Sequence, residues 1–112
     1  MKINVREHMS LLLTAHAKRQ AESRDIPKST FWAADRAAKR SGLKEKLILH
    51  HKRLFPMLNE KKILLRVDDR LVKASKDQLT TRLVLSDGTT FAVGIRRVGE
   101  NYSPLTCLTA WT

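Results

Sequence analysis

The dipeptide Asp87-Gly88 is the feature that most constrains the fold of this 112-residue chain. It lies between two runs rich in β-forming residues, residues 80–85 and 90–98. Asp-Gly favours tight hairpin turns, because these turns need residues that tolerate positive φ. The sequence therefore predicts an antiparallel β-hairpin with its turn at residues 86–89.

Further strand-length segments flank this hairpin. Residues 63–67 form an apolar run, and Asp68-Asp69 offers a turn before residues 71–73. The threonine-rich residues 105–112 predict a closing strand. The half of the chain after Pro56 is therefore predicted to form mainly antiparallel strands.

The N-terminal half has helical periodicity instead. Apolar residues recur at helical spacing between residues 8 and 24, which predicts an amphipathic helix. After a break at residues 25–27, an alanine-rich run predicts a second helix, capped by Asp25 or Ser29 and ended by Gly42. Residues 43–55 fit a third short helix, although residues 47–49 could equally open a strand.

Helices first and strands afterwards predict an α+β fold. We expect two or three N-terminal helices packed on one face of a three- to five-stranded antiparallel sheet. The length predicts a single domain over residues 1–112, with a helical half to about residue 60 and a strand half from about residue 61.

The charge of the chain points to a polyanionic partner. It carries 22 Lys and Arg against 11 Asp and Glu, a net charge of +11. Such an excess favours RNA, DNA, an acidic protein or an anionic membrane surface. No segment has the 18 or more apolar residues of a membrane span.

The single cysteine, Cys107, excludes an intrachain disulfide and fits a reducing compartment. We therefore expect the protein to act in a cytoplasm, either where it is made or after delivery into a target cell.

The sequence lacks the motifs of metal-binding and phosphate-binding sites. The four histidines are His8, His16, His50 and His51. They show no metal-binding spacing, and the four glycines are too scattered for a phosphate-binding loop. We therefore expect neither a metal nor a cofactor. His50 and His51 stand beside Lys52 and Arg53, and this run is interpreted as a solvated basic segment.

What remains is metal-independent cleavage of RNA, in which the 2′-hydroxyl of the substrate is the nucleophile. His16 lies on the first predicted helix among cationic and small polar residues, so it is the candidate acid or base. Arg19 and Arg24 are candidate phosphate ligands. Arg96 and Arg97 point to opposite sheet faces, so at most one of them can serve a given site. The other candidate nucleic-acid-binding residues are Lys52, Arg53, Lys73 and Arg82.

Three segments together resemble a known group of enzymes. They are His16-Ala17-x-Arg19, Arg24-Asp25-Ile26 and Leu108-Thr109-Ala110-Trp111. The chain resembles small bacterial toxin ribonucleases of the barnase, EndoU, colicin and RelE-like superfamily, in particular a group of unassigned function that starts with a "His-Ala-x-x-Arg" helix. It departs from that group at Asp25, where a glycine is usual.

This resemblance implies metal-independent RNA cleavage with His16, Arg19 and Thr109 in the active site. A toxin of this kind also implies an acidic antitoxin or immunity protein as its inhibitor. By strict alternation Thr109 shares an apolar strand face with Cys107 and Trp111, where its hydroxyl needs a partner. We expect His16 to be that partner.

A second class of function stays open. A small phage or plasmid protein of this charge could bind nucleic acid or an acidic host protein without catalysis. Exposed aromatic residues among cations would suit single-stranded nucleic acid. The candidates are Phe31 and Trp32 with Lys39, Arg40, Lys44, Lys46, Lys52 and Arg53. Phe31 and Trp32 are nevertheless interpreted first as core residues, and a helix-turn-helix around Pro27 ranks third.

Overall fold

The computed structural model describes residues 9–112, and they form an α+β fold in which the helices precede most of the strands. The helices are α1 (Ala15–Ser23), α2 (Lys28–Ser41) and α3 (Leu43–Leu54), followed by a 3₁₀ turn at Phe55–Met57. The strands are β1 (Leu12–Leu13), β2 (Ile63–Val67), β3 (Arg70–Ala74), β4 (Gln78–Val84), β5 (Thr90–Val98), β6 (Asn101–Tyr102) and β7 (Thr106–Trp111).

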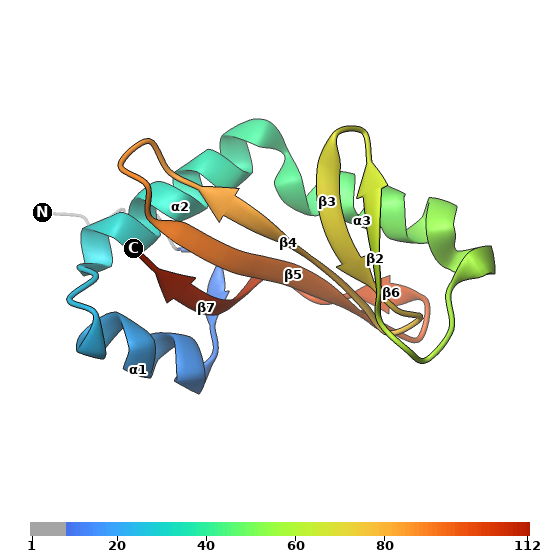
Figure 1. The fold of residues 1–112 in the computed structure, drawn as a ribbon, viewed down its shortest axis with the longest axis horizontal. Coiled ribbons are helices and arrows are strands. Elements are labelled where there is room, and N and C mark those ends of the chain that lie inside the picture. Colours follow the sequence, from blue (N-terminus) through green and yellow to red (C-terminus); the bar gives the residue numbers. More distant parts are fainter. Residues whose placement is uncertain (1–8) are drawn as a thin grey trace, which may run out of the picture.

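The strands form one sheet in the order β1-β7-β5-β4-β3-β2, and β6 pairs with β5 (Figure 1). All pairs are antiparallel except β1 with β7, which is parallel. The α+β class is therefore confirmed, but the sheet is wider than the three to five strands expected. The two-residue strands β1 and β6 account for the difference, because strands this short carry no alternating pattern of their own.

Both predicted turns are confirmed. Residues 85–89 join β4 to β5, with Gly88 at φ 92° and a hydrogen bond from Leu85 N to Thr89 O at 2.9 Å. Asp68 and Asp69 join β2 to β3 with φ of 49° and 65°. Both aspartates are therefore in the left-handed region that tight hairpin turns require.

The first helix begins later than predicted. Residues 9–14 are not helical, and residue 8 lies outside the described residues. Leu11 donates its N–H to the buried Asp35 Oδ1 at 3.0 Å, and Leu12 N–H bonds to Leu105 O at 2.9 Å, so this segment pairs with the sheet. Thr14 then caps α1 by accepting the Ala17 N–H at 3.0 Å.

The second and third helices lie where they were predicted. Helix α2 ends at Gly42, whose φ is 64°, and α3 follows at once. The predicted cap is wrong, however: Pro27 stands at the N-cap of α2, and no side chain there forms a capping hydrogen bond.

The hydrophobic core lies between the sheet and the pair of helices α2 and α3. Phe31 of α2 meets Phe91 of β5 edge to face, with ring centroids 5.3 Å apart. Val93 and Ile95 of β5 are almost fully buried beside it. Phe31 is thus a core residue, as its first interpretation held, whereas Trp32 is partly exposed.

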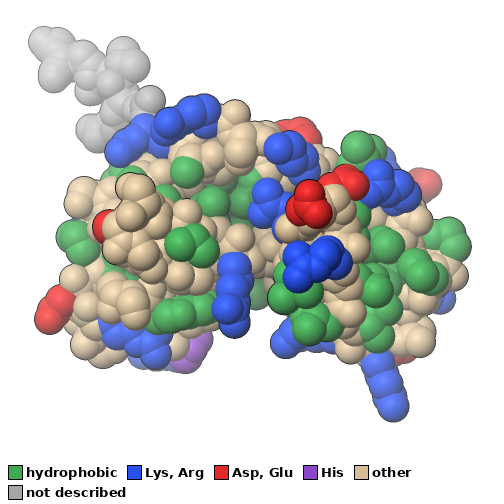
Figure 2. Space-filling model, turned by 45° about the horizontal axis from the view of Figure 1, so that its top comes forward, with side chains coloured by type: hydrophobic (Ala, Val, Ile, Leu, Met, Phe, Trp, Pro, Cys, Tyr) green, Lys and Arg blue, Asp and Glu red, His purple; other side chains and the backbone are tan. Residues whose placement is uncertain are grey.

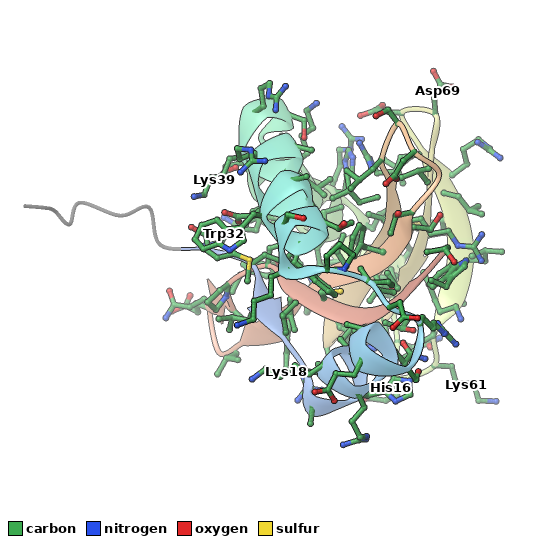
Figure 3. The ribbon with its side chains drawn as sticks, turned by 90° about the vertical axis from the view of Figure 1, so that its left-hand side faces the viewer. His16, Lys18, Trp32, Lys39, Lys61 and Asp69 are labelled. Atoms are coloured by element: carbon green, nitrogen blue, oxygen red, sulfur yellow. The ribbon has the colours of Figure 1, made fainter. Side chains whose placement is uncertain are left out.

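Helix α1 lies at the edge of the sheet, not on the face that α2 and α3 cover (Figures 1 and 3). Strand β1 pairs with the first residues of β7, and α1 covers the rest of that edge. Thr14 Oγ1 donates to Leu108 O at 3.2 Å, Gln20 Oε1 accepts the Ala110 N–H at 3.1 Å, and Arg24 donates to Ala110 O. The expected packing of all helices on one face is therefore corrected for α1.

The interpretation of His50 and His51 as a solvated segment is wrong. Both are buried, because they continue the inward face of α3 that begins with Leu43 and Leu47. The Nε2 atom of His51 lies 2.8 Å from Ser75 O, so Nε2 must carry a proton. In the neutral ring Nδ1 then accepts the hydroxyl of Tyr102 at 2.7 Å.

Candidate nucleic-acid interface

A β-bulge in β7 decides which face Thr109 occupies. Cys107 lies opposite the buried Val93, whereas Thr109 lies opposite Ala92, so Leu108 is an extra residue between them. An extra residue reverses the alternation of side chains along a strand. Thr109 and Trp111 therefore lie on the outer face of the sheet, and Cys107 lies on the core face. The predicted shared face for these residues is corrected.

The partner of Thr109 is Gln20 and not His16. The hydroxyl of Thr109 donates to Gln20 Oε1. Within residues 9–112, the side chain of His16 forms no hydrogen bond and is exposed on α1 (Figure 3). Arg19 is exposed on the same helix. The structure thus does not join the three predicted catalytic residues by contact.

The centre of the outer face of the sheet carries small residues. Ala92 of β5 stands between Thr109 and Arg82, its neighbours on the adjacent strands. The next outward residue of β5 is Gly94, which lies opposite Thr80. The Cγ2 methyl group of Thr80 lies 2.6 Å from the place that a Cβ atom of Gly94 would take, so the glycine allows β4 and β5 to pack closely here. Longer side chains surround these small residues, so the outer face is concave.

A groove of about 720 Å³ crosses this concave face. Strand β3 pairs with β4 only over Val72–Ala74, so the tip of the β2–β3 hairpin stands away from β4. Figure 2 shows the surface hollowed between two lobes, with Lys and Arg side chains on both sides of the hollow. The groove is lined in part by Leu64, Leu71, Lys73, Arg82, Ala92 and Trp111.

An aromatic and a cationic side chain meet at one wall of the groove. The Arg82 Cζ atom lies 5.4 Å from the centroid of the Trp111 ring, within the range of a cation–π interaction. Arg82 is exposed and Trp111 is partly exposed. This wall therefore presents a positive charge and an apolar ring side by side.

The remaining predicted nucleic-acid-binding residues are dispersed. Arg96 is exposed on the outer face opposite Gln78, whereas the Arg97 Cζ atom lies 4.5 Å from the Phe55 ring centroid on the other side of the strand. Lys52 and Arg53 are exposed on α3, and Arg53 pairs with Asp68 at 3.3 Å. Only Lys73, Arg82 and Arg96 of the predicted set share the outer face.

Sequence reasoning missed two elements of this surface. One is Arg66 of β2, which alternation alone would have placed outward beside Leu64. The other is the contribution of Trp111, because its contact with Arg82 spans strands that are distant in sequence. Asp68 and Asp69 also line the groove, so its rim carries both signs of charge.

Comparison with protein-family models, curated proteins and solved structures found no match to this chain. Among residues 9–112, no three His, Cys, Asp or Glu side chains are grouped so that they could hold a metal ion. None of the helices in that range is long and apolar enough to cross a membrane.

Proposed function

We propose that this protein binds RNA in the groove on the outer face of its sheet. The observation that carries the proposal is a groove lined by Arg82, Lys73 and the partly exposed Trp111, on the face that α2 and α3 leave uncovered. Arg82 and Lys73 supply charge for phosphates, and Trp111 supplies a ring on which an unpaired base can stack. The net charge of +11 adds long-range attraction to any such ligand.

Single-stranded RNA suits this groove better than a duplex. Base stacking on an aromatic ring requires an unpaired base, and sequence-tolerant stacking with backbone contacts is typical of single-strand binding. The apolar side chains of Leu64 and Leu71 also lie exposed in the groove, where they can contact base or sugar surfaces.

Charge reversal on the two sides of the molecule tests this proposal. Fluorescence anisotropy with a labelled single-stranded RNA should show that Arg82→Glu weakens binding by about tenfold or more and reduces the salt dependence of binding. Arg36→Glu is the matched control, because Arg36 is exposed on α2. Equal losses in the two variants would contradict binding in the groove, and tighter binding to an acidic polypeptide than to RNA would favour a protein partner.

Metal-independent cleavage of the bound RNA is a second candidate function. Its support is the exposed imidazole of His16 on a helix that Thr14, Gln20 and Arg24 fix to β7. In such a reaction the 2′-oxygen bonds to the adjacent phosphorus and the P–O5′ bond breaks. The 2′-hydroxyl proton passes to a base, and the 5′-oxygen gains a proton as it leaves. His16 would take the first proton, and exposed Arg19 would offset the charge on the phosphate.

This candidate predicts RNA degradation in the presence of EDTA, with a 2′,3′-cyclic phosphate as product. His16→Ala should abolish it, whereas Lys18→Ala, two residues away on α1, should not. Arg19→Ala should reduce the rate more than Arg36→Ala. Undiminished cleavage by His16→Ala would remove His16 from the site. If cleavage is found, an acidic antitoxin or immunity protein in the same cytoplasm becomes the expected inhibitor.

A further inference from the structure

The two edges of the sheet differ in how they end. The edge at β7 is covered by β1 and α1. The edge at β2 is open: β2 pairs with β3 on one side, and within residues 9–112 no backbone hydrogen bond reaches its other side (Figure 1). Leu64 on this strand is 62% exposed. Unpaired backbone groups beside an exposed leucine form a template for strand addition.

The charges around β2 are arranged symmetrically about Leu65. Within β2 and the residue on either side of it, residues at equal distances from Leu65 have opposite charges, or are both apolar, at two of the three positions. The matching positions are Ile63 with Val67 and Lys62 with Asp68. The exception is the pair Leu64 and Arg66, because only Arg66 is charged.

We propose that a second copy of this chain pairs with β2 in the antiparallel direction, about a two-fold axis through Leu65. In an antiparallel pair with this symmetry, each residue lies opposite its mirror position in the other copy. Lys62, just before β2, then lies near Asp68 of the second copy, which directly follows β2 and also pairs with Arg53 of its own chain at 3.3 Å. A lysine at a sheet edge ordinarily opposes strand addition, but here Lys62 meets a carboxylate.

The neighbouring registers are less favourable. An axis through Leu64 would place Lys62 opposite Arg66, and an axis through Arg66 would place that residue opposite itself. Like charges directly opposite each other destabilise a strand pair. The charges therefore favour an axis at Leu65 over either neighbouring axis.

This pairing would also cover exposed apolar surface. Leu64 would lie against the methylene groups of Arg66 of the second copy, since directly opposite residues share a face. The outer faces of the two copies would then point the same way, which places their two grooves on one continuous surface. The inference does not depend on what the groove binds.

Oxidative cross-linking tests the register directly. With its axis at Leu65, the pairing brings the Leu65 Cα atoms of the two copies to the distance of directly opposite residues, about 4.5–5.5 Å, which a disulfide can span. Leu65→Cys should therefore form a disulfide-linked dimer on non-reducing gels, whereas Leu64→Cys should not. The native Cys107 is fully buried and its pKa is raised to about 11 by burial, so it gives little background. Cross-linking of Leu64→Cys alone would overturn the register.

Charge exchange tests the same pairing without introducing a cysteine. Sedimentation of nucleic-acid-free protein up to about 1 mM should show a dimer that Lys62→Glu and Asp68→Lys each weaken by about tenfold. Combining the two changes should restore it, because the opposite charges are then exchanged. Arg36→Glu has the same charge change as Lys62→Glu and is its control, so it should leave the dimer intact. A monomer at all concentrations, or a dimer that both single variants leave unchanged, would overturn the proposal.

Discussion

The two faces of strand β5 differ sharply although they belong to one backbone. Phe91, Val93 and Ile95 point to the core and are at most 3% exposed. Between them, the small residues Ala92 and Gly94 lie on the outward side of the strand, and Ala92 lines the groove. One face carries the side chains that stabilise the fold, and the other has been left shallow and surrounded by cations. Substitutions on the two faces should therefore separate stability from binding.

The largest expected effect is on the core face. Phe91→Ala removes a fully buried ring that contacts Phe31 edge to face. Deleting a buried aromatic side chain costs about 3–5 kcal/mol in the free energy of unfolding. Urea denaturation should show this loss, and a loss below about 1 kcal/mol would mean that the core lies elsewhere.

A substitution on the outer face of β5 should have a smaller effect on the free energy of unfolding. In Gly94→Ala the new Cβ atom would lie 2.6 Å from the Leu79 carbonyl oxygen and 2.6 Å from Thr80 Cγ2. Because a backbone oxygen in the sheet cannot move away easily, we expect a loss of about 1–3 kcal/mol in unfolding free energy. Val84→Ala, at an exposed position of the same face, is the control and should stay within about 0.5 kcal/mol. Equal stability of both variants would show that β4 and β5 are not tightly packed at Gly94.

The core face should also respond to pH through His50. Burial lowers the pKa of His50 from its usual 6.5, so the unfolded chain takes up a proton at a higher pH than the folded one. Stability is then highest above pH 6.5 and falls as the pH drops below that value, by at most about 1.4 kcal/mol per pH unit. His50→Gln should flatten this part of the stability profile. An unchanged profile in His50→Gln would assign the pH dependence to another group.

The smallest effect on stability is expected for the cations of the outer face. Lys73→Ala removes an exposed side chain that forms no hydrogen bond within residues 9–112. Its unfolding free energy should stay within about 0.5 kcal/mol of the original chain, while its RNA affinity falls. A loss of stability as large as that of Gly94→Ala would remove the distinction between the two faces.

Local signals predicted much of the fold, and long-range contacts account for the errors. Neighbouring residues alone define the hairpin at the Asp87-Gly88 turn. The same holds for the helix between Pro27 and Gly42. Leu11 and Leu12 fit a helical pattern equally well, but the backbone of Leu12 bonds to Leu105, a partner far along the chain. Periodicity cannot show such a partner.

The candidate site was harder to predict for a related reason. Alternation placed Thr109 with Cys107, and the single extra residue Leu108 reversed that assignment. A bulge of this kind leaves no composition signal in the sequence. The pairing of Gln20 with Thr109 likewise depends on how α1 meets β7. Lys73 and Arg82 were predicted as candidates, and their common outer face became visible only from the pairing of β3, β4 and β5.

The two tryptophans provide the most direct test of binding on the outer face. Trp111 lines the groove, whereas Trp32 lies on α2 on the other side of the sheet (Figure 3). Their indole N–H groups give two separate NMR signals, which Trp32→Phe assigns. Titration with single-stranded RNA should shift the Trp111 signal and leave the Trp32 signal in place. A shift of the Trp32 signal alone, at RNA concentrations that saturate binding, would contradict the account.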